Sequence, residues 1–295
     1  MPSTCGVGQE HGGTAIPKRL WGRLWCLTPA RPSGGERVGR LEGRWFDVDG
    51  MRLHARVSVE PVPADAPVVI LVHGLAVSSA YMVPTAVRLA PDFAVYAPDL
   101  PGFGASDSPT EALDVPRLAD ALVAWMDAAG IGQAMLVGNS LGCQIIVSVA
   151  VRHPERVRRL VLQGPTVDRF ARSLPRQLAR LLLDVPREHP TQPLLQARDY
   201  LRFGVGRTLA TFRFARRDRI EDRLPLVRAP TLVVHGERDL IVSRRWVDEV
   251  TALLPTARLV VLPGAAHTPN YSTPTTFVRA IRPFLERADD EGPSP

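Results

Sequence analysis

The stretch MLVGNSLGCQ, from Met135 to Gln144, joins a short apolar run to a second apolar segment through one serine. Ser140 lies two residues after Gly138 and two residues before Gly142. A serine that only capped a helix would need no glycine before it. Because glycine lacks a side chain, it fits where a sharp turn crowds its neighbours. The stretch therefore predicts a tight strand-to-helix turn that exposes the Ser140 hydroxyl.

The chain around this turn alternates between apolar runs and segments with helical periodicity. Continuous apolar runs such as PVVILVHG (67–74) are typical of strands buried on both faces of a sheet. Alternation of this kind predicts a mainly parallel sheet with helices on both faces, and an initial hairpin across Asp49 and Gly50 adds antiparallel strands. We expect eight strands, at 44–48, 51–59, 67–74, 92–100, 133–139, 157–164, 229–236 and 257–264. We expect helices at 79–90, 115–129, 141–153, 243–254 and 274–287.

One long segment, residues 165–228, interrupts the alternation with helical pattern and loop but no convincing strand. Since it lies between two core strands, it predicts a helical cap above one end of the sheet. Residues 41–164 and 229–288 would then form the core. Residues 1–40, rich in Gly, Pro and Arg, are expected to be a flexible leader, and 289–295 a disordered tail.

Composition excludes several classes of protein. The chain has 295 residues, 45% of them hydrophobic, and its three cysteines (Cys5, Cys26 and Cys143) have neither disulfide-framework nor metal-site spacing, which favours the cytoplasm. We expect no signal peptide and no membrane-spanning segment, although the basic, aromatic stretch 18–26 could rest on a membrane surface. The net charge of +6 comes from 35 arginines and one lysine, which indicates a GC-rich genome rather than nucleic-acid binding.

Three polar residues follow separate predicted strands: Ser140, Asp239 after TLVVHG, and His267 after RLVVLPG. Ligands of open α/β sheets bind beyond the carboxyl ends of the strands, so these side chains should lie together. His267 would take the serine proton, and Asp239 would orient the imidazole and stabilise its charged form. Asp168 and Asp248 are alternative acids, although Asp168 is better explained as a helix cap.

An acyl-transfer site also needs donors for the developing oxyanion. The N–H of Leu141, at the start of a helix, is one candidate. The second should come from the loop HGLAVSS (73–79), with Leu75 N–H the better candidate and Ala76 the next. Ala76 and Asn139 are also candidate substrate-binding residues.

Five elements together resemble the α/β-hydrolase superfamily, in its serine branch with a helical cap: HGLAVSS (73–79), APDLPGFGASD (97–107), GNSLG (138–142), HGERDLIV (235–242) and PGAAHTPNY (263–271). The resemblance covers about residues 43–287. It implies cleavage of a small carboxylic ester, thioester or lactone through an acyl-enzyme, with no metal or cofactor. It also implies that His73 orients the oxyanion loop and that Asp99 fixes a turn.

Other functions remain open. The G-N-S-x-G form is frequent in hydrolases that cleave carbon–carbon bonds of ring-fission diketones, but those usually carry H-G-x-G-P-G where this chain has HGLAV. Related epoxide hydrolases and dehalogenases use aspartate at the elbow, which Ser140 disfavours. A ligand receptor on a hydrolase fold is the alternative from another class. We expect a small-molecule substrate and consider a homodimer.

The cap carries much of the net charge, since residues 165–223 hold 13 arginines and seven acidic residues. The spacing predicts a helix with Arg169, Arg172, Arg176 and Arg180 on one face and with Leu174, Leu178, Leu181 and Leu182 facing the core. The arginines could form a solvated face. Alternatively, one or two cap arginines, with Arg202, Arg207 and Arg213 as further candidates, could hold a substrate carboxylate.

Overall fold

The computed structural model describes residues 39–59 and 66–287. The expected tail and nearly all of the expected leader lie outside these ranges, as does the basic stretch 18–26.

The described chain forms one sheet of eight strands, in the spatial order β1-β2-β4-β3-β5-β6-β7-β8. Strands β1 and β2 form the predicted hairpin across Asp49 and Gly50, which both have positive φ. The β2–β4 pair is also antiparallel, and every later pair is parallel, as predicted. The strands are β1 Leu41–Val48, β2 Met51–Ser58, β3 Val68–Val72, β4 Ala94–Pro98, β5 Ala134–Asn139, β6 Val157–Gln163, β7 Thr231–Gly236 and β8 Ala257–Leu262.

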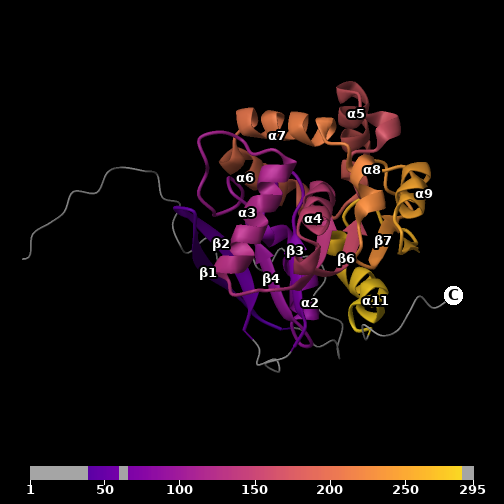
Figure 1. Ribbon diagram of the computed structural model, residues 1–295. Helices are drawn as coiled ribbons and strands as arrows, with labels where there is room; N and C mark the ends of the chain where they lie inside the picture. The colour runs from indigo at the N-terminus through magenta and orange to yellow at the C-terminus, as the bar shows by residue number, and fades with distance from the viewer. Residues whose placement is uncertain (1–38, 60–65, 288–295) are drawn as a thin grey trace, which may run out of the picture.

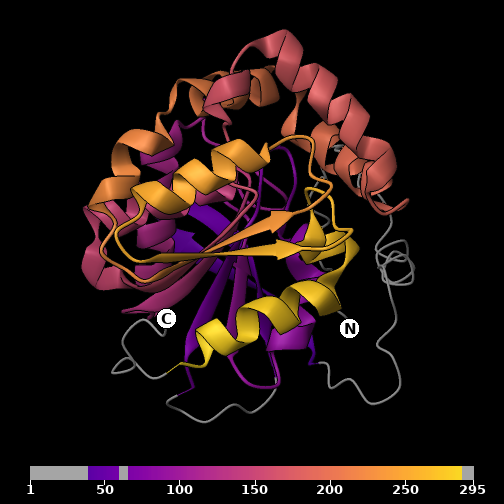
Figure 2. The same cartoon turned by 90° about the vertical axis from the view of Figure 1, so that its right-hand side faces the viewer.

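Helices cover both faces of this sheet, which explains why its strands are continuous apolar runs. Helices α3 (Val115–Ala128), α4 (Leu141–Arg152) and α9 (Arg244–Leu253) pack into one apolar core. Helices α2 (Val83–Leu89), α10 (Pro269–Ser272) and α11 (Pro274–Leu285) pack into the second core on the other face. Figure 2 shows α9 and α11 on opposite sides of the sheet.

Between β6 and β7 lie residues 165–228, whose regular elements are all helices. We call this segment the cap. It covers the end of the sheet at which the parallel strands finish (Figure 1). Its elements are η5 Arg169–Ala171, α5 Leu174–Asp184, η6 Val185–Arg187, α6 Gln192–Phe203, α7 Val205–Arg217, α8 Ile220–Arg223 and η7 Leu224–Leu226.

The prediction for the first cap helix was right about the side on which Leu174, Leu178 and Leu181 lie, and wrong about their burial. Leu174, Leu178, Leu181 and Leu182 were expected to face the core. The first three line the cavity between the cap and the sheet, but all four are exposed, whereas Gln177 and Asp184 of the same helix are buried. Asp184 is buried because the carboxyl end of the sheet, beneath α5, presents backbone polar groups that need partners. Asp184 accepts the N–H of Leu240, and Arg180 donates to the carbonyl of Ile241.

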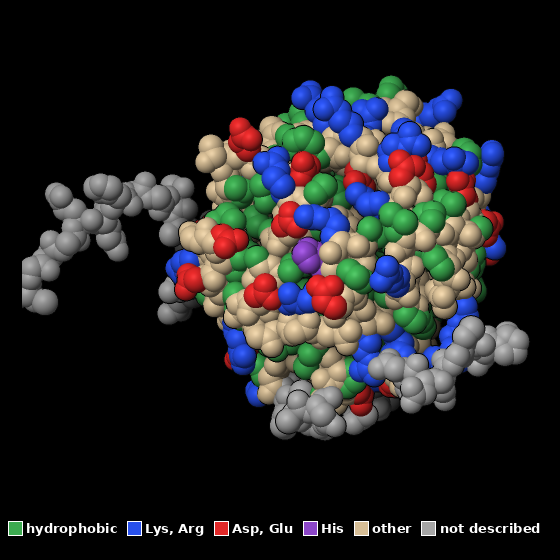
Figure 3. Space-filling view, in the orientation of Figure 1, with side chains coloured by type: hydrophobic (Ala, Val, Ile, Leu, Met, Phe, Trp, Pro, Cys, Tyr) green, Lys and Arg blue, Asp and Glu red, His purple; other side chains and the backbone are tan. Residues whose placement is uncertain are grey.

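The predicted arginine face was also wrong. Helix α5 begins at Leu174, so Arg169 and Arg172 precede it and pair with Glu249 and Glu221. Arg180 turns inward to Asp168, and only Arg176 points outward from the helix. Arginine side chains gather along the end of the molecule that α5 and α7 form (Figure 3). Within the described ranges, none of the helices is long and apolar enough to cross a membrane.

Candidate active site

Ser140 lies at the turn between β5 and α4, with φ 55° and ψ −117°. This is a strained conformation for a residue with a side chain. The flanking glycines are sterically required, because a Cβ on Gly138 would lie 2.7 Å from the carbonyl carbon of Gly142. A Cβ on Gly142 would lie 2.3 Å from the carbonyl oxygen of Val72. The turn therefore has the sharp geometry that the G-N-S-L-G spacing predicts.

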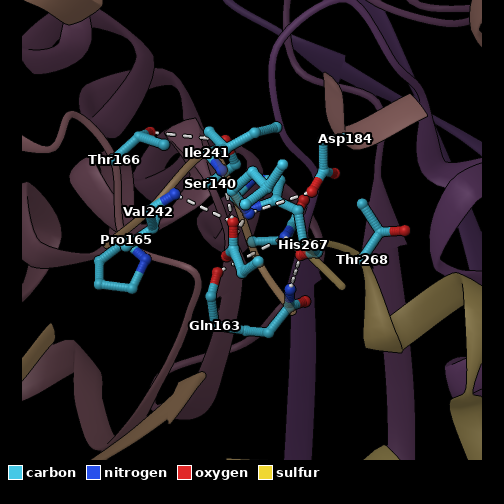
Figure 4. Close-up of polar contacts among 12 residues, drawn as sticks. Ser140, Gln163, Pro165, Thr166, Asp184, Ile241, Val242, His267 and Thr268 are labelled. Carbon is cyan, nitrogen blue, oxygen red and sulfur yellow. Dashed lines mark hydrogen bonds and ion pairs between the residues drawn. The ribbon is translucent and has the colours of Figure 1, made fainter. Parts of the chain in front are cut away.

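His267 and Asp239 form a buried pair at the ends of the loops that follow β8 and β7. The imidazole Nδ1 lies 2.8 Å from Asp239 Oδ2. The other carboxylate oxygen, Oδ1, accepts the N–H groups of Ile241 and Val242 at 2.8 and 2.9 Å (Figure 4). Both oxygens of the buried carboxylate are thus satisfied, and one of them is fixed on the ring.

The charge environment of His267 favours its protonated form. Burial alone lowers the pKa of this imidazole, but the charge and hydrogen bond of Asp239, with Asp184 and Glu188, raise it to about 9. An imidazolium that forms during proton transfer from a serine would be stabilised by the same carboxylates.

The two alternative acids do not contact the imidazole. Asp168 is fully buried at the cap entry, where it accepts the N–H of Phe170 and pairs with Arg180 at 2.6 Å. Its capping role matches the prediction. Asp248 lies on α9 with an exposed side chain and pairs with Arg244. Asp239 is the acid whose carboxylate contacts His267.

Ser140 and His267 line one cavity, and Thr166 lies beside them (Figure 4). The Ser140 Oγ is 3.5 Å from Thr166 Oγ1, a contact that sequence reasoning missed. Gly164 was missed as well. Its φ is +56°, and a Cβ there would lie 2.8 Å from His267 Cε1, so a larger residue would displace the imidazole.

The backbone of His267 is held by two side chains from the sheet. Gln163 Nε2 donates to the His267 carbonyl at 2.6 Å, and Asn139 Nδ2 reaches the same oxygen at 3.4 Å. Asn139 also accepts the Tyr81 hydroxyl. Asn139, predicted as a substrate contact, lines the cavity, but its described hydrogen bonds are all made with protein groups. Gln163 was missed because it ends an ordinary apolar strand.

The candidate oxyanion donors meet at the same place. Leu75, Ala76 and Leu141 all line the cavity with Ser140, and Ala76 has φ 55°. Buried His73 supports this loop, since its Nδ1 lies 2.9 Å from the carbonyl oxygen of Gly74 and its Nε2 accepts the N–H of Leu100. Burial lowers the pKa of His73, which agrees with a neutral ring.

Asp99 has the turn-fixing role that the resemblance implies. Its two oxygens accept the N–H groups of Ser79 and Ala105, and Oδ2 also contacts His54 at 2.9 Å. The carboxylate therefore ties the turn after β4 to the loop that carries the candidate oxyanion donors.

Two carboxylates of the cap reach the candidate site, and the sequence did not single them out. Asp184 and Glu188 line the cavity together with His267. Glu188 Oε1 accepts the N–H of Thr268 at 2.7 Å, and Oε2 accepts the hydroxyls of Thr268 and Ser272. Burial raises the pKa of Asp184 to about 6, opposed by His267 and reinforced by the negative charges of Asp239 and Glu188.

The cavity has a volume of about 620 Å³ and a mainly apolar wall. Leucine side chains of α5 and α7 form much of it, with Tyr81, Tyr200 and Phe212. No arginine or lysine of the described chain lines it, so the cap arginines do not supply the carboxylate contact considered above. Arg207, one of the inward candidates, instead donates to the carbonyls of Pro109 and Glu111. Within residues 39–59 and 66–287, no cluster of three or more His, Cys, Asp or Glu could hold a metal ion.

Comparison with known proteins assigns the family. The chain is 31% identical to a 2-hydroxymuconate semialdehyde hydrolase of Pseudomonas putida over 218 residues, which are 66% of this chain and 78% of the relative. It is 29% identical to the pimeloyl-[acyl-carrier protein] methyl ester esterase of Nitrosomonas europaea over 244 residues, which are 72% and 94% of the two chains.

The fold also recurs in solved structures. The crystal structure of a membrane phospholipase A, described as a bacterial virulence factor, superposes with a TM-score of 0.75, covering 92% of each chain at 23% identity, a similarity that concerns the fold alone. The model of the alpha/beta hydrolase family matches residues 69–280. The chain therefore belongs to the alpha/beta hydrolase family and is a hydrolase of that fold.

Proposed function

We propose that this hydrolase cleaves an uncharged carboxylic ester through an acyl-enzyme formed on Ser140, with His267 as the base and Asp239 as its orienting acid. One observation carries the proposal. His267, whose Nδ1 lies 2.8 Å from Asp239 Oδ2, lines the same cavity as Ser140, which lies at the strained turn between β5 and α4.

In the first half-reaction, the Ser140 oxygen attacks the ester carbonyl carbon while His267 Nε2 accepts the hydroxyl proton. The electron pair of the carbonyl moves to its oxygen, which the N–H groups of Leu75 and Leu141 stabilise. When the tetrahedral intermediate collapses, the carbon–oxygen bond to the alcohol breaks and His267 returns the proton to the leaving alkoxide.

In the second half-reaction, water repeats the same steps on the acyl-enzyme. His267 accepts a proton from water, the hydroxide attacks the acyl carbon, and the Ser140 oxygen leaves as the proton returns to it. Products are a carboxylic acid and the regenerated serine. None of these reaction steps requires a metal or an organic cofactor.

The charges of the cavity favour an uncharged acyl group. Asp184 and Glu188 are carboxylates at its wall, no arginine or lysine of the described chain lines it, and His267 is already paired with Asp239. A substrate carboxylate would enter an apolar cavity without an arginine or lysine partner and near like charges, which is costly. Thioesters and lactones satisfy the same chemistry and remain within the proposed class.

Carbon–carbon bond hydrolysis is the second candidate, favoured by the similarity to the Pseudomonas enzyme. The substrate in that relative's name, a hydroxymuconate semialdehyde, carries a carboxylate. The absence of an arginine or lysine from the described cavity wall counts against such a substrate here.

A matched set of substrates tests the proposal. Neutral p-nitrophenyl esters from butyrate to dodecanoate are compared with the p-nitrophenyl monoester of succinate and with a ring-fission dienone. We expect kcat/KM for butyrate to exceed that for the succinate monoester by at least about tenfold, because an unpaired charge near like charges costs more than about 1.4 kcal/mol.

The Ser140→Ala variant is the control, and it should lose the turnover of every ester. Faster turnover of the dienone than of any ester would contradict the proposed ester hydrolysis and would favour carbon–carbon bond cleavage as the activity. Absence of turnover and of covalent labelling in folded protein would favour a ligand receptor on this fold.

A further inference from the structure

Helix α5 and the turn after it carry a row of exposed apolar side chains, of which Leu182 and Leu183 do not line the cavity. We call this row the cap ridge: Leu174, Leu178, Leu181, Leu182, Leu183 and Val185. Leu182 is 72% exposed, Leu183 58% and Leu178 48%. Single exposed leucines are ordinary, but contiguous apolar surface of this kind marks an interaction site.

The exposed charges around the ridge are mainly positive, because the acidic side chains of the cap point inward. Five cap acids pair with arginines or contact core loops away from solvent: Asp168 with Arg180, Asp199 with Arg198, Asp218 with Arg223, Glu221 with Arg172, and Glu188 with Thr268. Asp184 is buried, and exposed Asp222 pairs with Arg219.

Exposed arginines remain beside the ridge. Arg176 on α5 and Arg187 on η6 are both exposed, and their described hydrogen bonds go to the backbone carbonyls of Phe170 and Leu183. Arg213 and Arg217 on α7 are exposed as well. A solvent-facing leucine row flanked by arginines is complementary to a surface that is apolar inside and negatively charged outside.

From this arrangement we propose that the cap ridge docks on an anionic lipid bilayer. The leucines enter the boundary between headgroups and acyl chains, and Arg176 and Arg187 contact lipid phosphates. Arg180 and Asp184 of α5 form hydrogen bonds with Ile241 and Leu240 in the loop after β7. These bonds hold the helix in this orientation, so the ridge is a fixed feature of the fold.

The ridge is also the rim of the cavity. Leu174, Leu178, Leu181 and Val185 are exposed and at the same time line the cavity that holds Ser140. A docked cap would therefore open the cavity toward the membrane, where apolar esters partition. This last step rests on the proposed function, whereas docking itself does not.

Vesicle co-flotation tests the docking. The full-length Ser140→Ala protein, which cannot hydrolyse the lipids, is mixed with phosphatidylcholine vesicles that contain about 30% phosphatidylglycerol, or with phosphatidylcholine alone. We expect binding to the anionic vesicles that is at least about tenfold tighter than to the neutral ones, and that weakens between about 0.05 M and 0.5 M salt.

Two pairs of variants in the same background separate the contributions. Leu182→Asn with Leu183→Asn, and Arg176→Gln with Arg187→Gln, should each weaken binding about tenfold or more. Leu226→Asn, an exposed leucine outside helices α5–α7, and Arg258→Gln with Arg279→Gln, on β8 and α11, should leave it unchanged.

Several results would overturn the proposal. The first is absence of binding to anionic vesicles, and the second is equal binding to neutral and anionic vesicles. The third is binding that the ridge variants do not change, which would mean that another part of the chain contacts the membrane. A solution dimer that Leu182→Asn with Leu183→Asn dissociates, without vesicle binding, would assign the ridge to a second copy of this chain. Failure of docking would leave turnover of soluble esters by wild-type protein unaffected, so the two proposals fail separately.

Discussion

Helices α11 and α5 have similar sequence patterns and opposite environments. Both carry a row of apolar side chains at helical spacing. Helix α11 buries its row, which includes Phe277 and Ile281, against the sheet. Helix α5 leaves its leucines exposed, three of them at the wall of the cavity, and buries Gln177 and Asp184. Periodicity therefore identifies the apolar side of a helix, but the surface beneath the helix decides which side is covered.

The difference arises from what each helix packs on. Helix α11 lies on apolar strand side chains, so burying its own apolar row removes both surfaces from water. Helix α5 lies on the loops that carry the candidate triad, where backbone N–H and C=O groups need partners. Asp184 and Arg180 supply those partners to Leu240 and Ile241.

The largest expected effect contrasts an acid of the core with an acid at the cap entry. Asp239→Asn should lower kcat by about three to four orders of magnitude, because the amide no longer stabilises the charged imidazole. Asp168→Asn should lower stability through loss of the Arg180 pair but keep kcat within about tenfold of wild type. Steady-state kinetics with p-nitrophenyl butyrate and thermal melts of both variants provide the measurements.

If Asp168→Asn loses turnover and Asp239→Asn keeps it, the acid is assigned to the wrong loop. Asp248→Asn serves as an exposed carboxylate control on α9, and it should leave both kcat and stability near wild type.

The second effect compares the two helices directly. Phe277→Ala in α11 should lower the free energy of unfolding by about 3–5 kcal/mol, because it leaves a cavity in a closed core. Leu182→Ala in α5 should change it by less than about 0.5 kcal/mol, since the side chain is exposed. Urea unfolding of both variants gives the two values. A large loss for Leu182→Ala would mean that the leucine row is covered in solution.

The smallest effect concerns the point where the cap reaches the core site. Asp184→Asn removes one negative charge that faces His267, beside Asp239 and Glu188. The pKa of the imidazole, about 9 with these charges present, should then fall. The acidic limb of the kcat/KM profile should move to lower pH by about one pH unit, and the plateau at high pH should fall because the imidazolium is less stabilised.

The size of that shift also depends on the protonation state of Asp184. Its own pKa is raised to about 6, so below that pH the wild-type carboxyl is neutral and the two profiles should converge. Asp120→Asn on α3, an exposed carboxylate paired with Arg152, is the matched control and should leave the profile unchanged. An unchanged profile for Asp184→Asn would confine the cap to a structural role.

The core was predictable from the sequence because its signals are local. Apolar runs locate the strands, and the glycines around Ser140 mark a turn whose crowding leaves no room for side chains. Asp239 and His267 follow from their places after two such strands.

The cap side of the site was not predictable, because its contacts join distant segments. Glu188 meets Thr268 across 80 residues of chain, and Asp184 meets Leu240 across 56. Neither acid has a distinctive neighbour in sequence. Gln163 and Gly164 were missed for a related reason, since their roles depend on where the loop of His267 returns.

Covalent labelling tests the central claim, that Ser140 is the nucleophile, most directly. The folded wild-type protein is treated with a fluorophosphonate probe, and the modified residue is located by mass spectrometry. The account predicts one label per chain on Ser140, and no label on Ser140→Ala protein of unchanged circular dichroism. Folded wild-type protein that stays unlabelled, or that carries its label on another serine such as Ser79, would contradict it.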